Sequence, residues 1–181
     1  MSTVVTFLFV MFSAFAQNHP ASTSPIPSCG PSEQDFDVKL DKTSHAVSQP
    51  QPGKALVYVI EVFQVPRKFF SGSPTIRIGL DGSWMGANRG NSYLSFSVAP
   101  GEHHLCGYWQ SSLPDTSGQR SLAGFFAEAG KTYFFRVQTH GEFDSAEPGT
   151  WSIDLQPIDA DEGKYLVSSY PLSISHLKKQ N

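Results

Sequence analysis

The chain has 181 residues, of which 16% are charged and 39% hydrophobic, and its formal net charge is −3 at pH 7. This length predicts one globular domain with flexible ends, and the slightly acidic balance argues against a general nucleic-acid binder. The 13 Pro and 15 Gly residues, together with few helical patterns, favour an all-β body.

Residues 1–16 have the pattern of a secretory signal peptide. An apolar run over 4–12 is followed by the small-x-small cleavage pattern Ala14-Phe15-Ala16. Because no Lys or Arg precedes the run, the true translation start stays open, and a buried N-terminal strand is the alternative. A spanning helix needs about 20 apolar residues, so we expect no transmembrane segment in the mature chain. We expect export to the periplasm or the extracellular space, or a peripheral position on the envelope.

Residues 17–34 form a predicted Pro/Ser-rich linker that contains Cys29. The only other cysteine is Cys106, which lies in a predicted strand. Two cysteines in an exported protein usually pair, so we predict a Cys29–Cys106 disulfide. In the chain-entropy model, closing so long a loop stabilises the fold by about 4.5 kcal/mol. Two free thiols and a lipid-modified Cys29 are the alternatives.

Residues 35–175 are predicted to form the folded domain. The segment 35–43 alternates apolar and charged residues, as an edge strand does. The segment 55–64 is apolar on both faces, which indicates a central strand covered on both sides. Four short strands are expected in 74–110, and a hairpin turn is expected at Asp81-Gly82.

The C-terminal third predicts three further features. Residues 122–128 and 131–139 read as a second hairpin, and 151–156 reads as a last strand. Asp159 and Glu162 form an Asp-x-x-Glu capping box for a helix over 159–169. Residues 172–181 are expected to be a loose tail, with 176–181 outside the domain. The fold predicted from all of these features is an antiparallel β-sandwich, Ig-like or prealbumin-like, with seven to eight strands and one short C-terminal helix.

Four segments carry a resemblance to a known family. They are GKALVYVIE, PTIRIGLDGSWMGANRGNSYLSFSVAPGEHHLC, AEAGKTYFFR and DADEGKYLV. In this order they resemble bacterial envelope proteins of the domain-of-unknown-function family 2846, over roughly residues 29–175. The resemblance implies an exported β-sandwich with a PEGA-like flavour, sometimes attached to the envelope. It brings no catalytic residues with it.

The sequence contains no motif that names a reaction. A nucleophile elbow, a phosphate-binding loop and a zinc-binding helix motif are all absent from it. His103 and His104 are adjacent in a predicted strand, so they point to opposite faces and cannot chelate one metal without a bulge. We therefore predict no catalytic residue, no cofactor and no metal. A metal-dependent or hydrolytic enzyme using Glu102, His103 or His104 is the least favoured alternative.

The predicted function is a non-catalytic accessory or interaction module of the bacterial cell envelope, with an envelope protein or polymer as its partner. The alternative is a carbohydrate- or small-ligand-binding module, because exposed aromatic side chains can stack on sugars or anchor partners. The candidate ligand residues are Trp84, Asn88, Arg89 and Asn91. Turn chemistry and core packing are the competing interpretation of these four residues. Exposure of Trp84 or Trp109 beside a groove would favour ligand binding.

Overall fold

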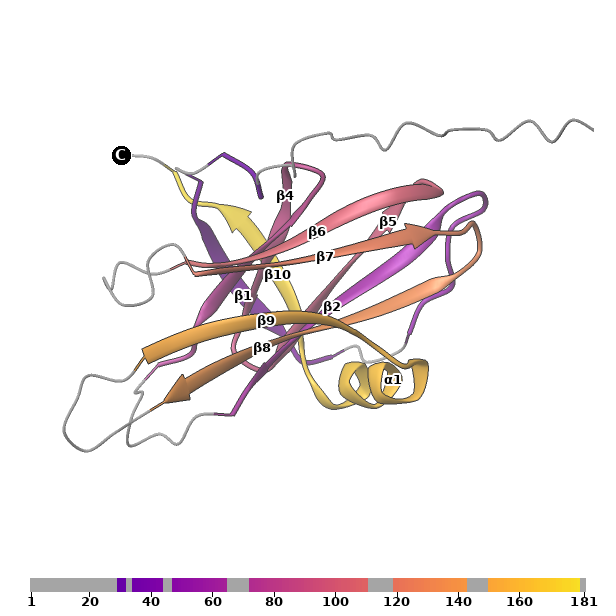
Figure 1. The fold of residues 1–181 in the computed structure, drawn as a ribbon. Coiled ribbons are helices and arrows are strands. Elements are labelled where there is room, and N and C mark those ends of the chain that lie inside the picture. The colour runs from indigo at the N-terminus through magenta and orange to yellow at the C-terminus, as the bar shows by residue number, and fades with distance from the viewer. Residues whose placement is uncertain are drawn as a thin grey trace, which may run out of the picture.

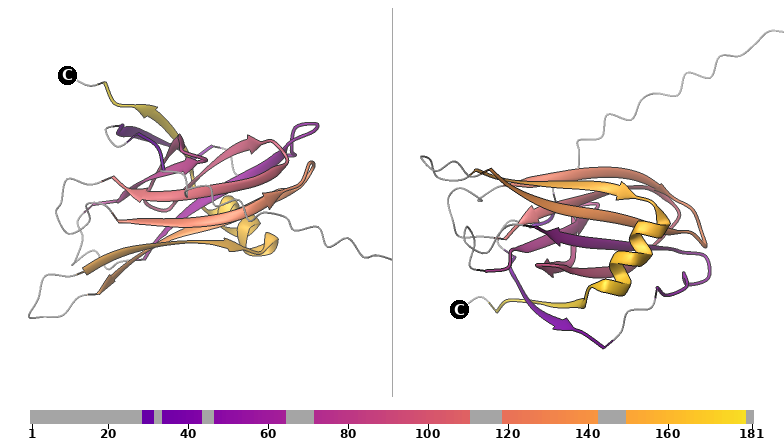
Figure 2. Two further views of the ribbon diagram at one scale, coloured as in Figure 1. Left: turned by 45° about the horizontal axis from the view of Figure 1, so that its top comes forward. Right: turned by 90° about the horizontal axis from the view of Figure 1, so that it is seen from below.

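A computed structural model describes residues 29–31, 34–43, 47–64, 72–110, 119–142 and 150–179. These residues form two β-sheets packed face to face, with one short helix near the C-terminus (Figures 1 and 2). The predicted all-β sandwich is confirmed, with ten strands in place of the seven to eight expected. The predicted signal peptide lies outside the described residues.

The two sheets differ in size and order. The larger sheet has the strand order β1 (Phe36–Asp41), β10 (Leu172–Leu177), β5 (Ser92–Val98), β2 (Ala55–Phe63), β8 (Thr132–Glu142) and β9 (Thr150–Ile158). The smaller sheet has the order β4 (Ser83–Arg89), β3 (Thr75–Leu80), β6 (Gly101–Trp109) and β7 (Arg120–Ala127). We call them the six-stranded and four-stranded sheets. β2 runs antiparallel to β5 and parallel to β8.

Strand β2 is buried on both faces, as the sequence predicts. Val57 and Val59 point into the core between the sheets, whereas Tyr58 and Ile60 belong to a second apolar cluster that includes Val167 of the helix. The helix α1 (Ala160–Ser169) therefore covers the side of the six-stranded sheet that faces away from β6 and β7 (Figure 1). Among the residues that the structure describes, no helix is long and apolar enough to cross a membrane.

Of the predicted capping box of α1, the role of Asp159 is confirmed. The Asp159 carboxylate accepts hydrogen bonds from the backbone N–H groups of Asp161 and Glu162, each at 2.9 Å. The Glu162 carboxylate instead accepts a hydrogen bond from the guanidinium of Arg136 on β8 at 2.6 Å. The capping residues thus begin the helix and also tie it to the sheet.

The predicted hairpin of residues 122–128 with 131–139 is wrong. β7 pairs with β6 in the four-stranded sheet, while β8 pairs with β2 and β9 in the six-stranded sheet. The turn between them carries the chain across the sandwich, and the Gly130 N–H is donated to the Lys54 carbonyl at 2.9 Å. The apolar faces of both strands therefore meet across the core, where the Phe125 and Phe135 ring centroids lie 5.0 Å apart.

The prediction of a loose tail over 172–181 is wrong for residues 172–177. These residues form β10, which pairs antiparallel with β1 and touches β5 at one position. Ser173 and Ser175 provide inward contacts of this strand: Ser173 Oγ lies 2.7 Å from Ser92 Oγ, and Ser175 Oγ accepts the Ala87 N–H at 3.1 Å. The segment alternates briefly, with Leu172 and Ile174 against Ser173 and Ser175, but here the serines face inward and Ile174 is exposed.

Candidate binding face of the four-stranded sheet

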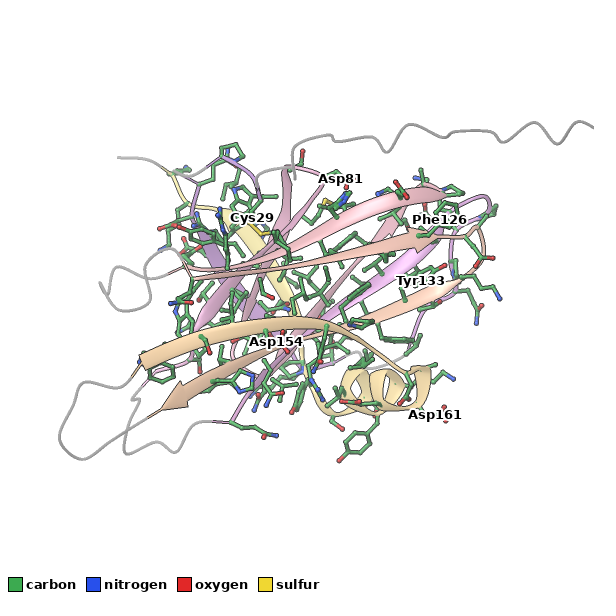
Figure 3. The ribbon with its side chains drawn as sticks, viewed as in Figure 1. Cys29, Asp81, Phe126, Tyr133, Asp154 and Asp161 are labelled. Atoms are coloured by element: carbon green, nitrogen blue, oxygen red, sulfur yellow. A yellow bond between two sulfur atoms is a disulfide. The ribbon has the colours of Figure 1, made fainter. Side chains whose placement is uncertain are left out.

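A short segment near the N-terminus crosses the outer face of the four-stranded sheet. We call the described residues 29–31 and 34–35 the strap. Cys29 forms a disulfide with Cys106 of β6, with their Cα atoms 5.3 Å apart (Figure 3), which confirms the predicted pairing. The Cys29 carbonyl lies so close to Gly79 of β3 that a side chain at that position would collide with it. The strap is therefore in direct contact with the sheet.

Two side chains of the sheet donate hydrogen bonds to backbone carbonyls of the strap. The Trp84 indole N–H donates to the Pro31 carbonyl at 2.8 Å, and the Arg77 guanidinium donates to the Gln34 carbonyl at 2.7 Å. The guanidinium lies over the Trp84 and Tyr108 rings, 4.8 and 4.5 Å from their centroids. Arg77 also forms an ion pair with the Asp35 carboxylate, with 3.6 Å between nitrogen and oxygen, so the sheet holds the strap through backbone carbonyls and through one side chain.

Neither of the two tryptophans proposed as ligand platforms stands free beside a groove. Trp84 is half-buried under the strap, and its ring lies against Gly30. Trp109 is 2% exposed and packs edge-on against Trp151, with centroids 5.4 Å apart. Trp109 therefore lacks the exposure beside a groove that would favour ligand binding. Trp84 lies on the outer face, where it contacts the strap.

The other three candidate ligand residues are not gathered into one site. Asn88 is fully buried and donates its amide N–H to the Val59 carbonyl at 2.9 Å. Asn91 is exposed, and its side-chain oxygen accepts the Phe63 N–H at 2.6 Å. Arg89 is exposed at the end of β4. Asn88 and Asn91 thus join β4 and its following turn to β2, which is a structural role.

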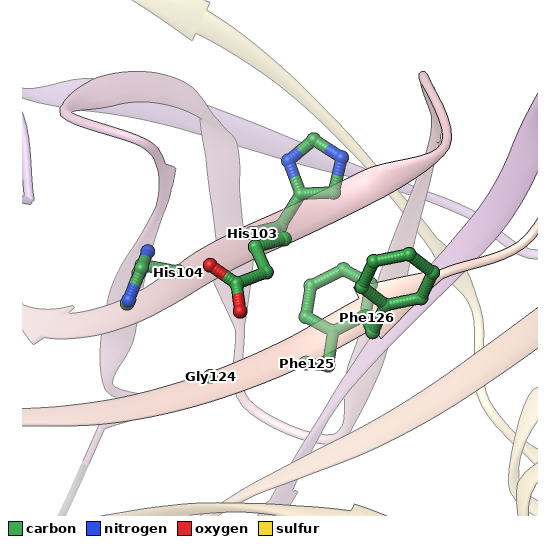
Figure 4. A pocket seen from close by; sticks show the side chains of 6 residues that line it. His103, His104, Gly124, Phe125 and Phe126 are labelled. Carbon is green, nitrogen blue, oxygen red and sulfur yellow. The ribbon is translucent and has the colours of Figure 1, made fainter. Parts of the chain in front are cut away.

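The strap leaves the other half of the outer face open. There, Glu102 is paired with Phe126, His104 with Gly124, and Cys106 with Leu122 across β6 and β7. Because Gly124 has no side chain, a hollow of about 270 Å³ opens beside it (Figure 4). We call this hollow the notch; its lining residues are Glu102, His103, His104, Gly124, Phe125 and Phe126.

The notch is flanked by exposed apolar side chains that the sequence interpretation did not single out. Phe126 is 63% exposed and Leu122 is 43% exposed, and each lies next to Gly124 on the outer face of β7. The available signal was the run Leu122-Ala123-Gly124-Phe125-Phe126, which is apolar at both strand faces. The assumed hairpin with 131–139 concealed that one of these faces is open.

His103 lies below the notch and links the β3–β4 turn to the β5–β6 turn by hydrogen bonds. Its Nδ1 lies 2.7 Å from the Asp81 carboxylate and its Nε2 lies 2.8 Å from the Ala99 carbonyl. The other Asp81 oxygen accepts the His104 N–H at 2.8 Å. Both ring nitrogens face acceptors, so the doubly protonated ring satisfies both. Burial lowers the pKa of His103, but the hydrogen bonds to Asp81 and Ala99 and the charge of Asp81 outweigh it and raise the pKa above its ordinary value.

The two histidines occupy opposite faces of β6, as the sequence predicts. His103 is half-buried and His104 is exposed. Across the described ranges, no group of three or more His, Cys, Asp and Glu side chains is placed to hold a metal ion. This face presents an aromatic ring, an aliphatic side chain, a carboxylate and an imidazole.

One carboxyl group lies inside the sandwich, away from this face. Glu61 follows Val59 on the core side of β2 and is fully buried. Neither of its carboxyl oxygens has a hydrogen-bond partner of good geometry, and the same holds for Asn88 Oδ1 and Thr139 Oγ1. Burial raises the pKa of Glu61 well above its ordinary value and outweighs the Gly90 N–H, which acts in the opposite direction. Burial thus favours the protonated acid.

The protein is a β-sandwich in which the Cys29–Cys106 disulfide joins an N-terminal segment to the outer face of the four-stranded sheet. No family model matches the chain, and neither does any curated protein or solved structure. The resemblance to family 2846 accordingly stays a prediction.

Proposed function

We propose that this chain is an exported, non-catalytic accessory or interaction module of the bacterial cell envelope. It binds an envelope protein or polymer through the outer face of the four-stranded sheet. The observation that carries this proposal is the pair Leu122 and Phe126, two exposed apolar side chains that flank the notch. Apolar side chains gathered on one surface mark interaction sites more often than single exposed ones do.

The surroundings of this pair suit a binding surface. Glu102 and His104 are exposed beside it and supply a carboxylate and an imidazole for polar contacts at the rim. All four side chains stand on the paired strands β6 and β7, so little order has to be gained on binding. A preorganised surface loses less conformational entropy when a partner binds.

Export is supported by two independent features. Residues 1–16 have the signal-peptide pattern, and the Cys29–Cys106 disulfide joins the only two cysteines of the chain. Structural disulfides persist in oxidising compartments such as the periplasm or the extracellular space.

The test is co-sedimentation of the oxidised protein with isolated bacterial envelope fractions. Removing an exposed aromatic anchor typically weakens binding by about 2 kcal/mol, or about thirty-fold, so Phe126→Ser should abolish most of the binding. The matched control is Tyr165→Ser, because Tyr165 is 69% exposed but lies on α1. Full binding by Phe126→Ser, or an equal loss in both variants, contradicts the proposal.

A carbohydrate- or small-ligand-binding module is the second candidate. It is favoured by one observation: the exposed Phe126 ring stands opposite Glu102, so that an aromatic face and a hydrogen-bonding group lie side by side. Ligand sites combine such surfaces to hold and orient their ligands. A glycan array probed with the oxidised protein decides this candidate, since silence across the array removes it.

A further inference from the structure

Strand β7 forms a free edge of the four-stranded sheet, in which β6 is its neighbour. The Gln119 carbonyl accepts the Trp109 N–H at 3.0 Å, so the odd-numbered residues that follow in this antiparallel ladder direct their backbone groups toward β6. The even-numbered residues Leu122, Gly124 and Phe126 therefore direct their N–H and C=O groups away from it. Within the described ranges, no backbone hydrogen bond joins these groups to another strand.

This edge lacks the features that keep an exposed strand from pairing with another chain. Charged residues and proline on an edge strand discourage such pairing. In the six-stranded sheet, the edge strand β1 contains Lys39 and the edge strand β9 contains Pro157. The other edge of the four-stranded sheet, β4, is covered at Ala87 by Ser175 of β10. Residues 121–127 of β7 contain neither a charged residue nor proline, so this edge is open to pairing with a further strand.

The exposed residues of β7 are self-complementary about Gly124. Arg120 and Leu122 precede it, and Phe126 and Glu128 follow it, at alternating positions that are all exposed. In two copies of β7 that run antiparallel with the Gly124 residues opposite each other, Leu122 faces Phe126 of the second copy. Arg120 then faces Glu128 of the second copy, and two-fold symmetry makes each pair occur twice. Opposite charges across strands stabilise a sheet, and an aromatic–aliphatic pair buries apolar surface.

The backbone of β7 favours the same register. The three residues that direct their backbone groups outward lie opposite one another in it, so they can form hydrogen-bonded pairs of an antiparallel ladder. A shift by one residue would instead oppose them to residues whose groups bond to their own β6. A shift by two residues keeps the backbone match but moves Arg120 away from Glu128. Because the Glu128 N–H already bonds to the Tyr133 hydroxyl at 2.9 Å, the copies meet through side chains at this position.

We propose that two copies of this chain form a symmetric dimer through β7, which joins their four-stranded sheets into one continuous sheet. The two-fold axis passes between the Gly124 residues, and the outer faces of both copies lie on the same side of the joined sheet. The two notches then lie side by side, with Leu122 and Phe126 of each copy still facing outward. Such a dimer presents the proposed binding surface twice, and bivalent contact strengthens binding to an envelope surface. This consequence rests on the proposed function, whereas the dimer does not.

The experiment is sedimentation velocity of the oxidised protein, without envelope material, at concentrations up to about 1 mM. We expect a reversible monomer–dimer equilibrium in wild type. Arg120→Glu and Glu128→Arg should each weaken dimerisation by about five- to thirty-fold, because each brings two pairs of like charges together. The control is Lys39→Glu, which makes the same change of charge at an exposed position of β1 and should dimerise like wild type.

A mixture of the two charge variants tests the register. Arg120→Glu mixed with Glu128→Arg restores both pairs of opposite charge between unlike copies, so the mixture should form heterodimers with the affinity of wild type. Hydrogen exchange tests the backbone pairing in wild type. Exchange at the amides of Leu122, Gly124 and Phe126 should slow as the protein concentration rises, whereas the Ala123 amide, which is directed toward β6, should exchange at a constant rate.

A protein that stays monomeric up to about 1 mM overturns the inference. So does a dimer that Arg120→Glu leaves unchanged, or a mixture of the charge variants that associates no better than each variant alone. None of these outcomes affects the co-sedimentation test, because a monomer can also bind envelope fractions. A failed co-sedimentation test, in turn, leaves the dimer in place.

Discussion

Glu61 places a carboxyl group where the neighbouring core positions of β2 hold valine, and it does so without a hydrogen-bond partner of good geometry. Its raised pKa makes stability depend on pH. Below the pKa of the unfolded chain, about 4.3, both states hold the proton. As the pH rises, the unfolded chain ionises first, and the free energy of unfolding falls by about 1.4 kcal/mol per pH unit until folded Glu61 also ionises.

The first prediction is that Glu61→Gln increases the free energy of unfolding at pH 7 and flattens its decrease above about pH 4.3. The substitution keeps the shape of the side chain and removes the charge. Urea denaturation between acidic and neutral pH measures both effects. If Glu61→Gln makes the protein less stable than wild type at pH 7, an ionised Glu61 is stabilised in the fold and the prediction is wrong.

The contribution of His103 to the free energy of unfolding also falls as the pH rises, but for a different reason. Its folded pKa is raised, so its contribution is fully present below the unfolded pKa of about 6.5 and is lost as the pH rises through the folded pKa. We predict that His103→Gln lowers the free energy of unfolding by about 1 kcal/mol at acidic pH and by less at alkaline pH, since Asp81 is partly exposed to solvent. His104→Gln, on the exposed face of the same strand, is the control and should keep the wild-type pH dependence.

The strap is the element on which the outer face depends most. We predict that Cys29→Ala with Cys106→Ala lowers the free energy of unfolding by about 2 to 4.5 kcal/mol, because the unfolded chain regains the entropy of an open loop. The double variant should also expose Trp84 to acrylamide quenching, since the Trp84–Pro31 hydrogen bond loses its covalent anchor. Reductant should reproduce both effects in wild type and change nothing in the double variant. Unchanged stability after reduction would contradict the role of the strap.

In the helix α1, the packing of Gly163 against the sheet opposes the intrinsic helix propensity of alanine. Gly163 lies in the helix interior, where Ala is favoured by about 1 kcal/mol. However, an added Cβ at Gly163 would overlap the Phe134 ring on β8, and overpacking of this kind costs about 1–3 kcal/mol. We predict that Gly163→Ala lowers the melting temperature. Lys164→Ala, at the exposed neighbouring position, is the control and should leave it nearly unchanged. A rise for Gly163→Ala would mean that α1 moves away from the sheet easily.

Elements with local signals could be predicted from the sequence, and elements set by distant partners could not. β2 is apolar at nearly every position, the β3–β4 turn is an Asp-Gly pair, and α1 begins at an Asp-x-x-Glu box. By contrast, β7 and β8 alternate like hairpin strands but lie in different sheets. β10 alternates only briefly, and its serines rather than its apolar residues face inward, so its sequence does not predict the side that packs.

At the scale of the whole molecule, the candidate face arises from pairings that no local pattern reveals. The notch exists because Gly124 is opposite His104, and the strap lies beside it because Cys29 is bonded to Cys106. The disulfide could be predicted from cysteine count and export, but the open side of β7 could not, because it depends on the register with β6. The aromatic candidate chosen from sequence, Trp84, is hydrogen-bonded to the strap, whereas Phe126 is exposed beside the notch.

The most direct test of the account is footprinting of the oxidised protein by hydroxyl radicals, with and without bacterial envelope fractions. The outer face of the four-stranded sheet is predicted to be the contact surface, so Phe126 and Leu122 should be protected when envelope material is present. Tyr165 on α1, which is about as open to solvent as Phe126, should be modified to the same extent in both samples. Protection of Tyr165 with no change at Phe126 and Leu122 would contradict the central claim.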